Sequence, residues 1–375
     1  MTPSQVQDRL RDWLEANVDG WSDVRIQPLE VTTGSGFSAQ IFFVDVEYNG
    51  PDGPRAKTLV VRRQPQDHEV VFGSSLKLQG QMIAALDALG SVPVPEWIGM
   101  ELDPSVLEMP FIVMGRVEGH AATQNPNYNT TGWLYDMAPA QRGASWRNAI
   151  HAYAGMASID WQNDGFGFMA RPDWGAPGLD QYLGYIEAWY LACHKDREMP
   201  YVDKAMAYIR EHQPADTPVN VLWGDSTPSN VMFAEDGGVN ALIDWELAAL
   251  GPSELDLAWW LYFDDLFSRR FDVERLDGLP TRDETVAIWE AATGSKAQHL
   301  EYYDIVVALR MALVAVGAFD RQVAIGNIPN TNKSLNSNFM TFYLAERLGM
   351  ELPELGADFY AFMSNMTPVD QKEDG

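Results

Sequence analysis

The sequence predicts an α+β protein in which a small sheet-containing lobe precedes a larger, mostly helical lobe. Two observations support this prediction. Short alternating apolar runs, typical of strands, are concentrated between residues 24 and 115, and helical periodicity prevails beyond Gly119. With 375 residues, of which 46% are hydrophobic, the chain is long enough to bury two cores. We place the two lobes at residues 1–115 and 116–375.

The first lobe opens with an amphipathic helix, because apolar residues recur at i, i+4, i+7 and i+8 from Val6. Strand-like runs VRIQPLEV, AQIFFVDVEY and KTLVVRR follow. The last two are predicted to form a hairpin through Asn49-Gly50, since Asn-Gly supplies the positive φ that tight turns need. A helix over 75–89 ends at Gly90, and FIVMGRV reads as a further strand. This lobe is therefore expected to be an antiparallel sheet with a packed helix.

In the second lobe we expect helices at 140–159, 179–193 and 202–211. The segment VNVLWGDSTPSNVMFAEDGGVNALIDWELAALG interrupts them with short apolar runs and polar turns, and it predicts small strands that present loop residues. The apolar run 305–319 carries Arg310 near its centre and is shorter than the ~20 residues that a membrane-spanning helix needs. We expect it to be a buried helix.

The charge of the chain restricts its partners. The 53 Asp and Glu residues outnumber the 26 Lys and Arg residues and give a formal net charge of −27. An acidic surface repels phosphate backbones and anionic lipids, so we expect neither nucleic acid nor a membrane as a partner. The lone Cys193 and the N-terminus without a basic-then-apolar pattern favour a cytoplasmic location. The oligomeric state stays open.

Three polar residues in the strand-and-turn segment form the densest cluster that could carry chemistry. Asp225 and Asn230 bracket one loop, and Asp244 follows the apolar run ALI. Phosphoryl transfer needs a carboxylate that orients the acceptor hydroxyl and oxygen ligands that hold magnesium on the phosphates. Each residue alone could simply cap a turn or a helix. The spacing of all three together favours phosphoryl transfer.

This segment resembles the aminoglycoside phosphotransferase-like family, relatives of the protein kinases, whose pattern is H-G-D-x-x-x-x-N followed by a strand ending in D-W-E. The resemblance implies a two-lobe protein-kinase-like fold. It implies that Asp225 is the catalytic aspartate and that Asn230 and Asp244 ligate magnesium. Asp256, in GPSELDLA, matches an aspartate that braces the catalytic loop in the family.

The resemblance extends to the nucleotide side of the site. TTGSGF matches a phosphate-covering loop, and VVRRQP matches the strand that carries the phosphate-anchoring cation, for which alignment selects Arg62. Arg63 should then face the opposite side and solvent, by strand alternation. PFIVMGRVEG matches the connector that lines the adenine site. The nucleotide-binding residues implied are Gly34, Ser35, Gly36, Phe37, Arg62, Met114, Gly115, Arg116 and Val117.

Two positions depart from the family pattern. Gln79 stands where the family often has a glutamate that pairs with the cation, and a neutral amide cannot neutralise a guanidinium. Trp223 replaces the motif histidine, which bonds to backbone near the magnesium-binding loop in the family. These changes suggest a diverged branch, similar to the kinase domain fused to some acyl-CoA dehydrogenases.

The sequence thus predicts a phosphotransferase that uses ATP or another NTP with Mg²⁺ and acts on a hydroxyl of a small molecule. The many aromatic residues after Gly119 favour a partly apolar alcohol or a hydroxyacyl acceptor. An aminoglycoside-modifying kinase and a catalytically lapsed nucleotide- or ligand-binding pseudokinase are the alternatives. Since ATP–magnesium is itself anionic, the excess acid belongs mainly to the outer surface and argues little for a cationic acceptor.

Overall fold

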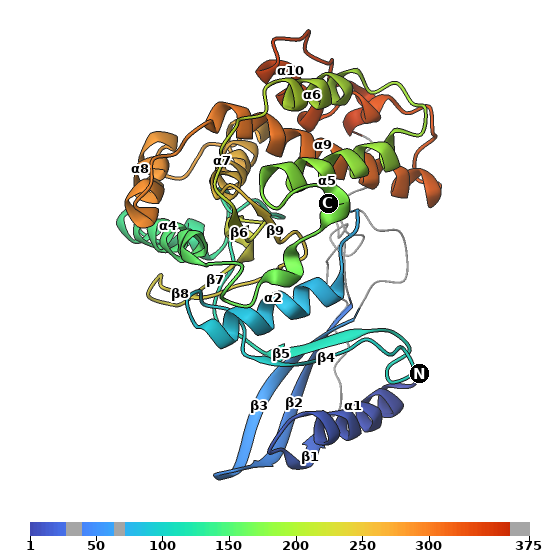
Figure 1. Ribbon diagram of the computed structural model, residues 1–375, viewed down its shortest axis with the longest axis vertical. Coiled ribbons are helices and arrows are strands. Elements are labelled where there is room, and N and C mark those ends of the chain that lie inside the picture. The colour runs from blue at the N-terminus through green and yellow to red at the C-terminus, as the bar shows by residue number, and fades with distance from the viewer. Residues whose placement is uncertain (28–39, 64–71, 361–375) are drawn as a thin grey trace.

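A computed structural model describes residues 1–27, 40–63 and 72–360 of the chain. The N-terminal lobe is a five-stranded antiparallel sheet in the order β1-β2-β3-β5-β4 (Figure 1). Its strands are β1 (Ser22–Ile26), β2 (Gln40–Gly50), β3 (Gly53–Arg63), β4 (Trp97–Glu101) and β5 (Phe111–Gly115). The predicted hairpin is confirmed, because β2 pairs with β3 along its whole length up to Gly50 and Gly53.

Two helices cover opposite faces of this sheet (Figure 1). On one face α1 (Pro3–Asn17) packs Trp13 edge-on against Phe111. On the other face α2 (Leu76–Leu89) places Gly80 against Ile112, the next residue of β5. Ser75 caps the start of α2. Gly90, in the left-handed conformation, ends the helix, as the sequence predicts.

Strand β4 was not predicted from the sequence. Its five residues contain Gly99 and lack the alternation of a half-buried strand. A Cβ at Gly99 would lie 2.8 Å from the Trp13 ring, so the glycine allows α1 to approach the sheet closely. Tertiary packing, rather than local propensity, therefore specifies this strand.

The expectation that Arg63 faces solvent is wrong. Its side chain is 7% exposed, its guanidinium donates to the Leu107 carbonyl over 2.5 Å, and it lies over the Phe42 ring. Strand β3 is internal to the sheet, and the chain leading into β5 covers this face. Both arginines of VVRRQP are therefore buried, on opposite faces of β3.

The C-terminal lobe is mostly helical. Its helices are α3 (Trp133–Asp136), α4 (Pro139–Ala154), α5 (Leu179–His194), α6 (Pro200–Glu211), α7 (Glu254–Phe267), α8 (Arg282–Thr293), α9 (Leu300–Ala324) and α10 (Phe339–Arg347). Short 3₁₀ turns lie at Gly155–Ser158, Gly167–Met169, Pro172–Trp174, Pro228–Asn230, Arg269–Phe271 and Lys333–Leu335. The helix expected over 140–159 thus ends at Ala154 and continues as a 3₁₀ turn.

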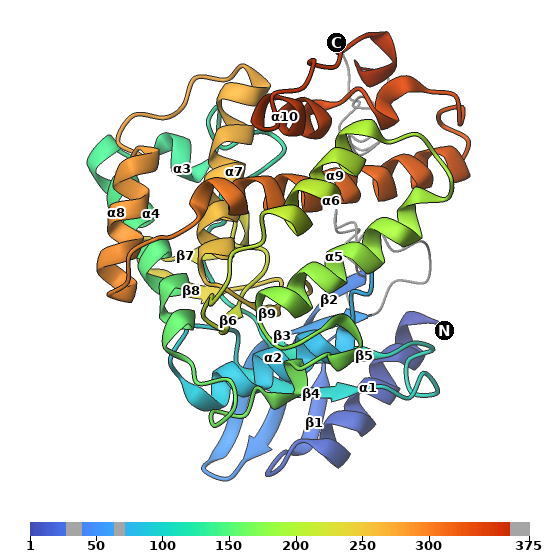
Figure 2. The same ribbon diagram turned by 45° about the horizontal axis from the view of Figure 1, so that its top comes forward.

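Two small antiparallel sheets interrupt these helices. One pairs β6 (Asn220–Leu222) with β9 (Ala249–Gly251), and the other pairs β7 (Val231–Phe233) with β8 (Val239–Leu242). Figure 2 shows α5 between α9 and the N-terminal lobe, with the small sheets beside it. The predicted short strands are therefore present, and the turns between them lie where the two lobes meet.

Helix α9 contains the apolar run noted in the sequence. Among the described residues it is the one helix long and apolar enough to cross a membrane, but 78% of its most apolar window is buried inside the protein. It packs against α5, α6, α7 and α10. This arrangement is that of a core helix, as predicted for 305–319.

Candidate active site

Asp225 lies on the loop between β6 and β7, which we call the Asp225 loop (residues 223–230). Its Oδ1 accepts a hydrogen bond from Trp259 Nε1 over 2.8 Å, and its Oδ2 accepts one from Asn230 Nδ2 over 2.7 Å. Gly224, at φ +84°, makes this geometry possible, because a Cβ there would lie 1.9 Å from the Leu247 carbonyl oxygen. The carboxylate is therefore held in one orientation.

The surroundings of Asp225 perturb its acidity. Burial and, to a lesser extent, the nearby Asp244 carboxylate raise its pKa to about 6, while Arg310, Trp259 and Asn230 oppose the shift. A carboxyl group with such a pKa accepts a proton more readily than an exposed aspartate does.

Asn230 and Asp244 approach Asp225 from two sides. Asp244 begins the turn of the loop after β8, which we call the DWE loop (residues 243–249), and it has a positive φ of 61°. The Ile243 N–H donates to the Asn230 carbonyl over 2.9 Å and thereby ties the two loops together. The three residues that the sequence grouped by spacing are thus brought together.

The donor set here fits magnesium. Asn230 uses its amide nitrogen to hold Asp225, and within the described part of the chain no donor takes its Oδ1. Asp244 supplies a carboxylate that is 29% exposed. Protein Mg²⁺ sites typically use one or two hard oxygen ligands and leave the rest to water and phosphate. No cluster of three or more His, Cys, Asp or Glu with metal-site geometry occurs among the described residues.

Asp256 braces the Asp225 loop from α7. Its two carboxylate oxygens accept the backbone N–H groups of Trp223 and Gly224, each over 2.8 Å, and its own carbonyl accepts the Ser226 hydroxyl over 2.7 Å. This is the supporting position that the family resemblance implied. The brace fixes the two residues that precede Asp225.

Trp223 compensates for the missing histidine. Its Nε1 donates to the Ile243 carbonyl over 2.9 Å, so the side chain still joins the Asp225 loop to the backbone of the DWE loop. It is fully buried and packs beside Trp245 and Tyr153. The substitution therefore preserves the connection between the loops.

Arg62 pairs with the DWE loop rather than with α2. Its guanidinium lies 3.0 Å from Asp244 Oδ1 and 3.3 Å from Glu246 Oε2, and its side chain is 10% exposed. Gln79 is buried beside the same cavity, and no hydrogen bond joins it to Arg62 in the described residues. Glu246 thus supplies a countercharge that the sequence analysis had sought on α2. The glutamate of the D-W-E motif, Glu246, was the sequence signal from which this countercharge could have been predicted.

A cavity of about 340 Å³ opens between the sheet and the DWE loop. It is lined by the predicted Arg62 and all four predicted connector residues, and by Gln79, Asp244 and apolar side chains that include Ile41, Val60, Ile83, Ile112, Met232 and Ile243. The connector is fixed because the N–H of Gly115 bonds to the Glu96 carbonyl and that of Arg116 to the Thr58 carbonyl. The predicted phosphate loop, Gly34 to Phe37, lies outside the described residues.

Arg310 and Trp259 are site residues that sequence reasoning did not find. Arg310, 2% exposed on α9, lies 3.4 Å from the centre of the Trp259 ring and donates to the Gly224 carbonyl over 2.5 Å. Trp259 in turn donates to Asp225. The sequence signal for Arg310 was a cation in the middle of an apolar helix. The residues that it contacts, Gly224 and Trp259, could not be predicted from sequence spacing.

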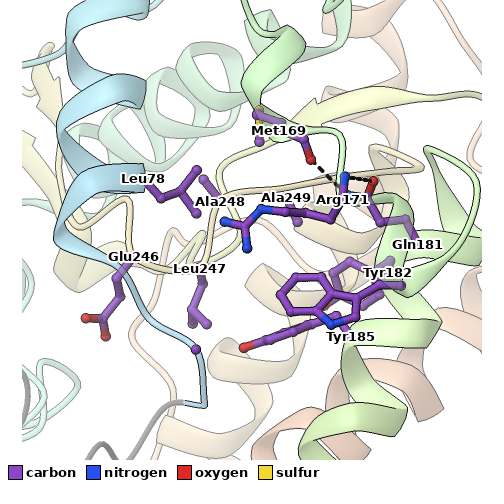
Figure 3. Close-up of a pocket in the computed structure, with 12 residues that line it drawn as sticks. Leu78, Met169, Arg171, Gln181, Tyr182, Tyr185, Glu246, Leu247, Ala248 and Ala249 are labelled. Atoms are coloured by element: carbon purple, nitrogen blue, oxygen red, sulfur yellow. Dashed lines mark hydrogen bonds between the residues drawn. The ribbon is translucent and has the colours of Figure 1, made fainter.

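A second, smaller cavity of about 40 Å³ lies on the other side of the DWE loop (Figure 3). It is lined by Gly73, Leu78, Met169, Arg171, Trp174, Gln181, Tyr182, Tyr185, Glu246, Leu247, Ala248 and Ala249. Three of the aromatic residues counted in the sequence therefore line a pocket, whereas others, including Trp146 and Trp189, are fully buried core residues.

Comparison with known proteins settles the family. The profile of the Phosphotransferase enzyme family (APH) matches residues 32–289, more than half of the chain. The chain belongs to this family. The match spans strands β2 to β5, the connector, and the Asp225 and DWE loops, so the resemblance deduced from these motifs is confirmed.

The curated relatives are larger proteins. Acyl-CoA dehydrogenase family member 11 of Pongo abelii is 23% identical over 297 residues, which cover 76% of this chain and 36% of the relative. An Arabidopsis thaliana protein named "Probable acyl-CoA dehydrogenase IBR3" is 24% identical over 368 residues, covering 90% and 42%. The chain thus spans less than half the length of these relatives. They confirm the predicted branch.

Solved APH structures share the fold. A Ralstonia eutropha protein described as a candidate aminoglycoside phosphotransferase has a TM-score of 0.67 at 22% identity, over 91% of this chain and 98% of that one. A thermostable variant of aminoglycoside phosphotransferase APH(4)-Ia, in complex with ADP and hygromycin B, has a TM-score of 0.52 at 12% identity, over 91% and 98%. These likenesses establish the two-lobe kinase-like fold.

Proposed function

We propose that this APH-family protein transfers the γ-phosphate of ATP, in a magnesium-dependent reaction, to a hydroxyl group of a small molecule. The observation that carries the proposal is the convergence of Asp225, Asn230 and Asp244 beside the 340 Å³ cavity that the connector lines. We place the lobe boundary between residues 115 and 116, within the connector.

Asp225 is the residue that accepts or orients the proton of the acceptor hydroxyl. Two hydrogen bonds fix its carboxylate, and its raised pKa suits it to take a proton. Because phosphoryl transfer depends mainly on positioning and charge stabilisation, a fixed carboxylate is the main protein group that the reaction requires.

The nucleotide would occupy the larger cavity. Ile83, Ile112 and Met114 provide apolar contacts for a base, and the Val117 N–H has no acceptor within the described residues. Arg62 would hold phosphate oxygens, with Gly34 to Phe37 covering them. Asn230 and Asp244 would hold magnesium, which when bound offsets charge on the phosphates. The ADP and AMP-PNP complexes of structural neighbours support a nucleotide here.

The acceptor is proposed to be a partly apolar alcohol or hydroxyacyl compound that enters from the smaller cavity. Leu78, Met169 and Leu247 contribute apolar wall there, and Tyr185 an aromatic one. An aminoglycoside acceptor is less compatible with this cavity, because it carries several positive charges and Arg171 lines the wall.

A screen of small hydroxyl compounds with ATP and Mg²⁺, read by the mass shift of a phosphate on the acceptor, tests the proposal. We expect one class of compounds to gain a phosphate, and we expect ATP to raise the melting temperature only with Mg²⁺ present. Stabilisation by ATP without transfer to any compound across a broad library would instead favour a lapsed pseudokinase.

A further inference from the structure

Arg171 gives the smaller cavity a positive charge. The residue lies between two 3₁₀ turns of the C-terminal lobe, and its guanidinium extends toward the space between Leu78 and Leu247 (Figure 3). The backbone N–H of Arg171 donates to Gln181 Oε1 over 2.7 Å, and Gln181 Nε2 donates to the Met169 carbonyl over 3.0 Å. These bonds fix the backbone from which the cation projects.

The guanidinium of Arg171 has no countercharge in the part of the chain that the structure describes. Among the described residues no carboxylate pairs with it and no oxygen accepts a hydrogen bond from it. Its central carbon lies over the Trp174 ring, 5.1 Å from the ring centre. Glu246 also lines the cavity, but its carboxylate points away from Arg171 and bonds to Arg62 (Figure 3). In a protein of net charge −27, an arginine without a partner in a pocket is a conspicuous exception.

We propose that the smaller cavity binds an anionic group of the acceptor, a carboxylate or a phosphate ester, through Arg171. This proposal rests on the function proposed above, because it takes the bound ligand to be the acceptor of the phosphate. A guanidinium offers a planar fork of donors that matches both anions, and stacking on Trp174 leaves its N–H edge free to donate.

The size and walls of the cavity define the rest of the ligand. At about 40 Å³, the cavity has room for a compact group or a thin chain. Leu78 approaches from α2, Tyr185 from α5 and Ala248 from the DWE loop. Apolar walls around one cation suit an aliphatic chain that carries a single negative group.

The cavity directly adjoins the Asp225 loop. Ala249, on its wall, is the cross-strand partner of Leu222, and the Leu247 carbonyl packs against Gly224. Tyr182, also on the wall, accepts a hydrogen bond from Arg310 over 2.9 Å, and Arg310 bonds to the Gly224 carbonyl. An anion held at Arg171 would therefore share its cavity with wall residues that contact the Asp225 loop or its supports.

Equilibrium binding of matched probes tests the proposal without requiring turnover. The probes are ω-hydroxyalkyl carboxylates, ω-hydroxyalkyl phosphates, ω-hydroxy amides and ω-amino alcohols of equal chain length. They would be titrated into the full chain, with ATP absent, for the native protein, Arg171→Met and Arg171→Lys. Arg321→Met, which changes a half-buried arginine of α9 outside both cavities, is the matched control.

We expect one anionic series to bind the native protein about tenfold or more tighter than the amide series, and whichever series does so identifies the anion. Arg171→Met should abolish this preference, Arg171→Lys should retain part of it, and Arg321→Met should leave it unchanged. Equal binding of all series, preference for the amino alcohols, or an anion preference that survives in Arg171→Met would overturn the proposal. Failure of the phosphotransferase function appears separately, as absence of phosphate transfer in the mass-shift screen.

Discussion

The two cavities that flank the DWE loop differ in size, in charge and in how they are built. The larger one, about 340 Å³, lies under the sheet, is lined by connector backbone, and contains an arginine that is already paired with two carboxylates. The smaller one, about 40 Å³, lies between α2 and the helices and turns of the C-terminal lobe and contains an arginine without a carboxylate partner in the described residues. In the function that we propose, the nucleotide occupies the larger cavity and the acceptor occupies the smaller one, so the two ligands would be recognised by separate parts of the site.

The largest effect is expected on the nucleotide side, from Asp244→Ala. Loss of this carboxylate removes the proposed magnesium ligand and one partner of Arg62, so turnover should fall by about 10³-fold or more. ATP should no longer stabilise the protein in a magnesium-dependent manner, which thermal unfolding with and without EDTA measures. Unchanged magnesium-dependent stabilisation would remove Asp244 from the metal site.

A smaller effect is expected from Trp259→Phe, which supports Asp225 between the two cavities. The change deletes the hydrogen bond to Asp225 but keeps an aromatic ring beside Arg310, so kcat should fall roughly tenfold while KM for ATP stays constant. Steady-state kinetics separates these parameters. A native kcat would show that this bond does not position the carboxylate.

Arg310→Met tests the residue that lies over the Trp259 ring. It leaves the Gly224 carbonyl and the Tyr182 hydroxyl without their donor, so it should lower the free energy of unfolding by about 1–3 kcal/mol as well as lowering kcat. Chemical denaturation measures the first effect. If stability falls while kcat per folded molecule is unchanged, Arg310 is purely structural.

The ion pair of Arg62 gives a matched comparison. Glu246→Gln should lower kcat/KM for ATP several-fold, because it removes a charge that fixes the guanidinium. Gln79→Glu, which restores the glutamate typical of the family, should change it by less than about threefold, because Glu246 already provides the countercharge. The reverse order of effects would place the functional ion pair on α2.

The smallest effect is expected from Arg116→Met at the mouth of the larger cavity. Arg116 is already paired with Glu118 at 3.3 Å and lies over Phe43, both in exposed positions. KM for ATP should therefore change by less than about threefold. A large increase in KM would mean that Arg116 also contacts phosphate. The pairing of Arg116 with Glu118 would then not distinguish it from Arg171, which has no carboxylate partner among the described residues.

The features that the sequence predicted correctly are local ones, formed by residues close together in the chain. Local patterns were sufficient for the hairpin at Gly50, for the end of α2 at Gly90 and for the short strands around Asp225. Turn chemistry and periodicity act over a few residues, so they can be read from one sequence. The nucleotide side is built largely from such segments, which is why its motifs were recognisable.

Features that depend on residues far apart in the chain were missed or misjudged. Strand β4 exists because β5 pairs with it, and Arg63 is buried because a loop from residue 107 covers it. The contacts of Glu246 with Arg62 and of Arg310 with Gly224 join positions separated by 184 and 86 residues. Arg171 likewise lines a cavity only because α2, α5 and the DWE loop come together around it in the folded chain.

The most direct test of the central claim is a comparison of Asp225→Asn with the native protein, using γ-labelled ATP, Mg²⁺ and an acceptor found in the mass-shift screen. Asp236→Asn, in the exposed turn between β7 and β8, is the control. Our account predicts that label transfer falls by about 10³-fold in Asp225→Asn while the affinity for ATP is nearly unchanged, and that the control behaves as native. Transfer at a near-native rate in Asp225→Asn would contradict the account.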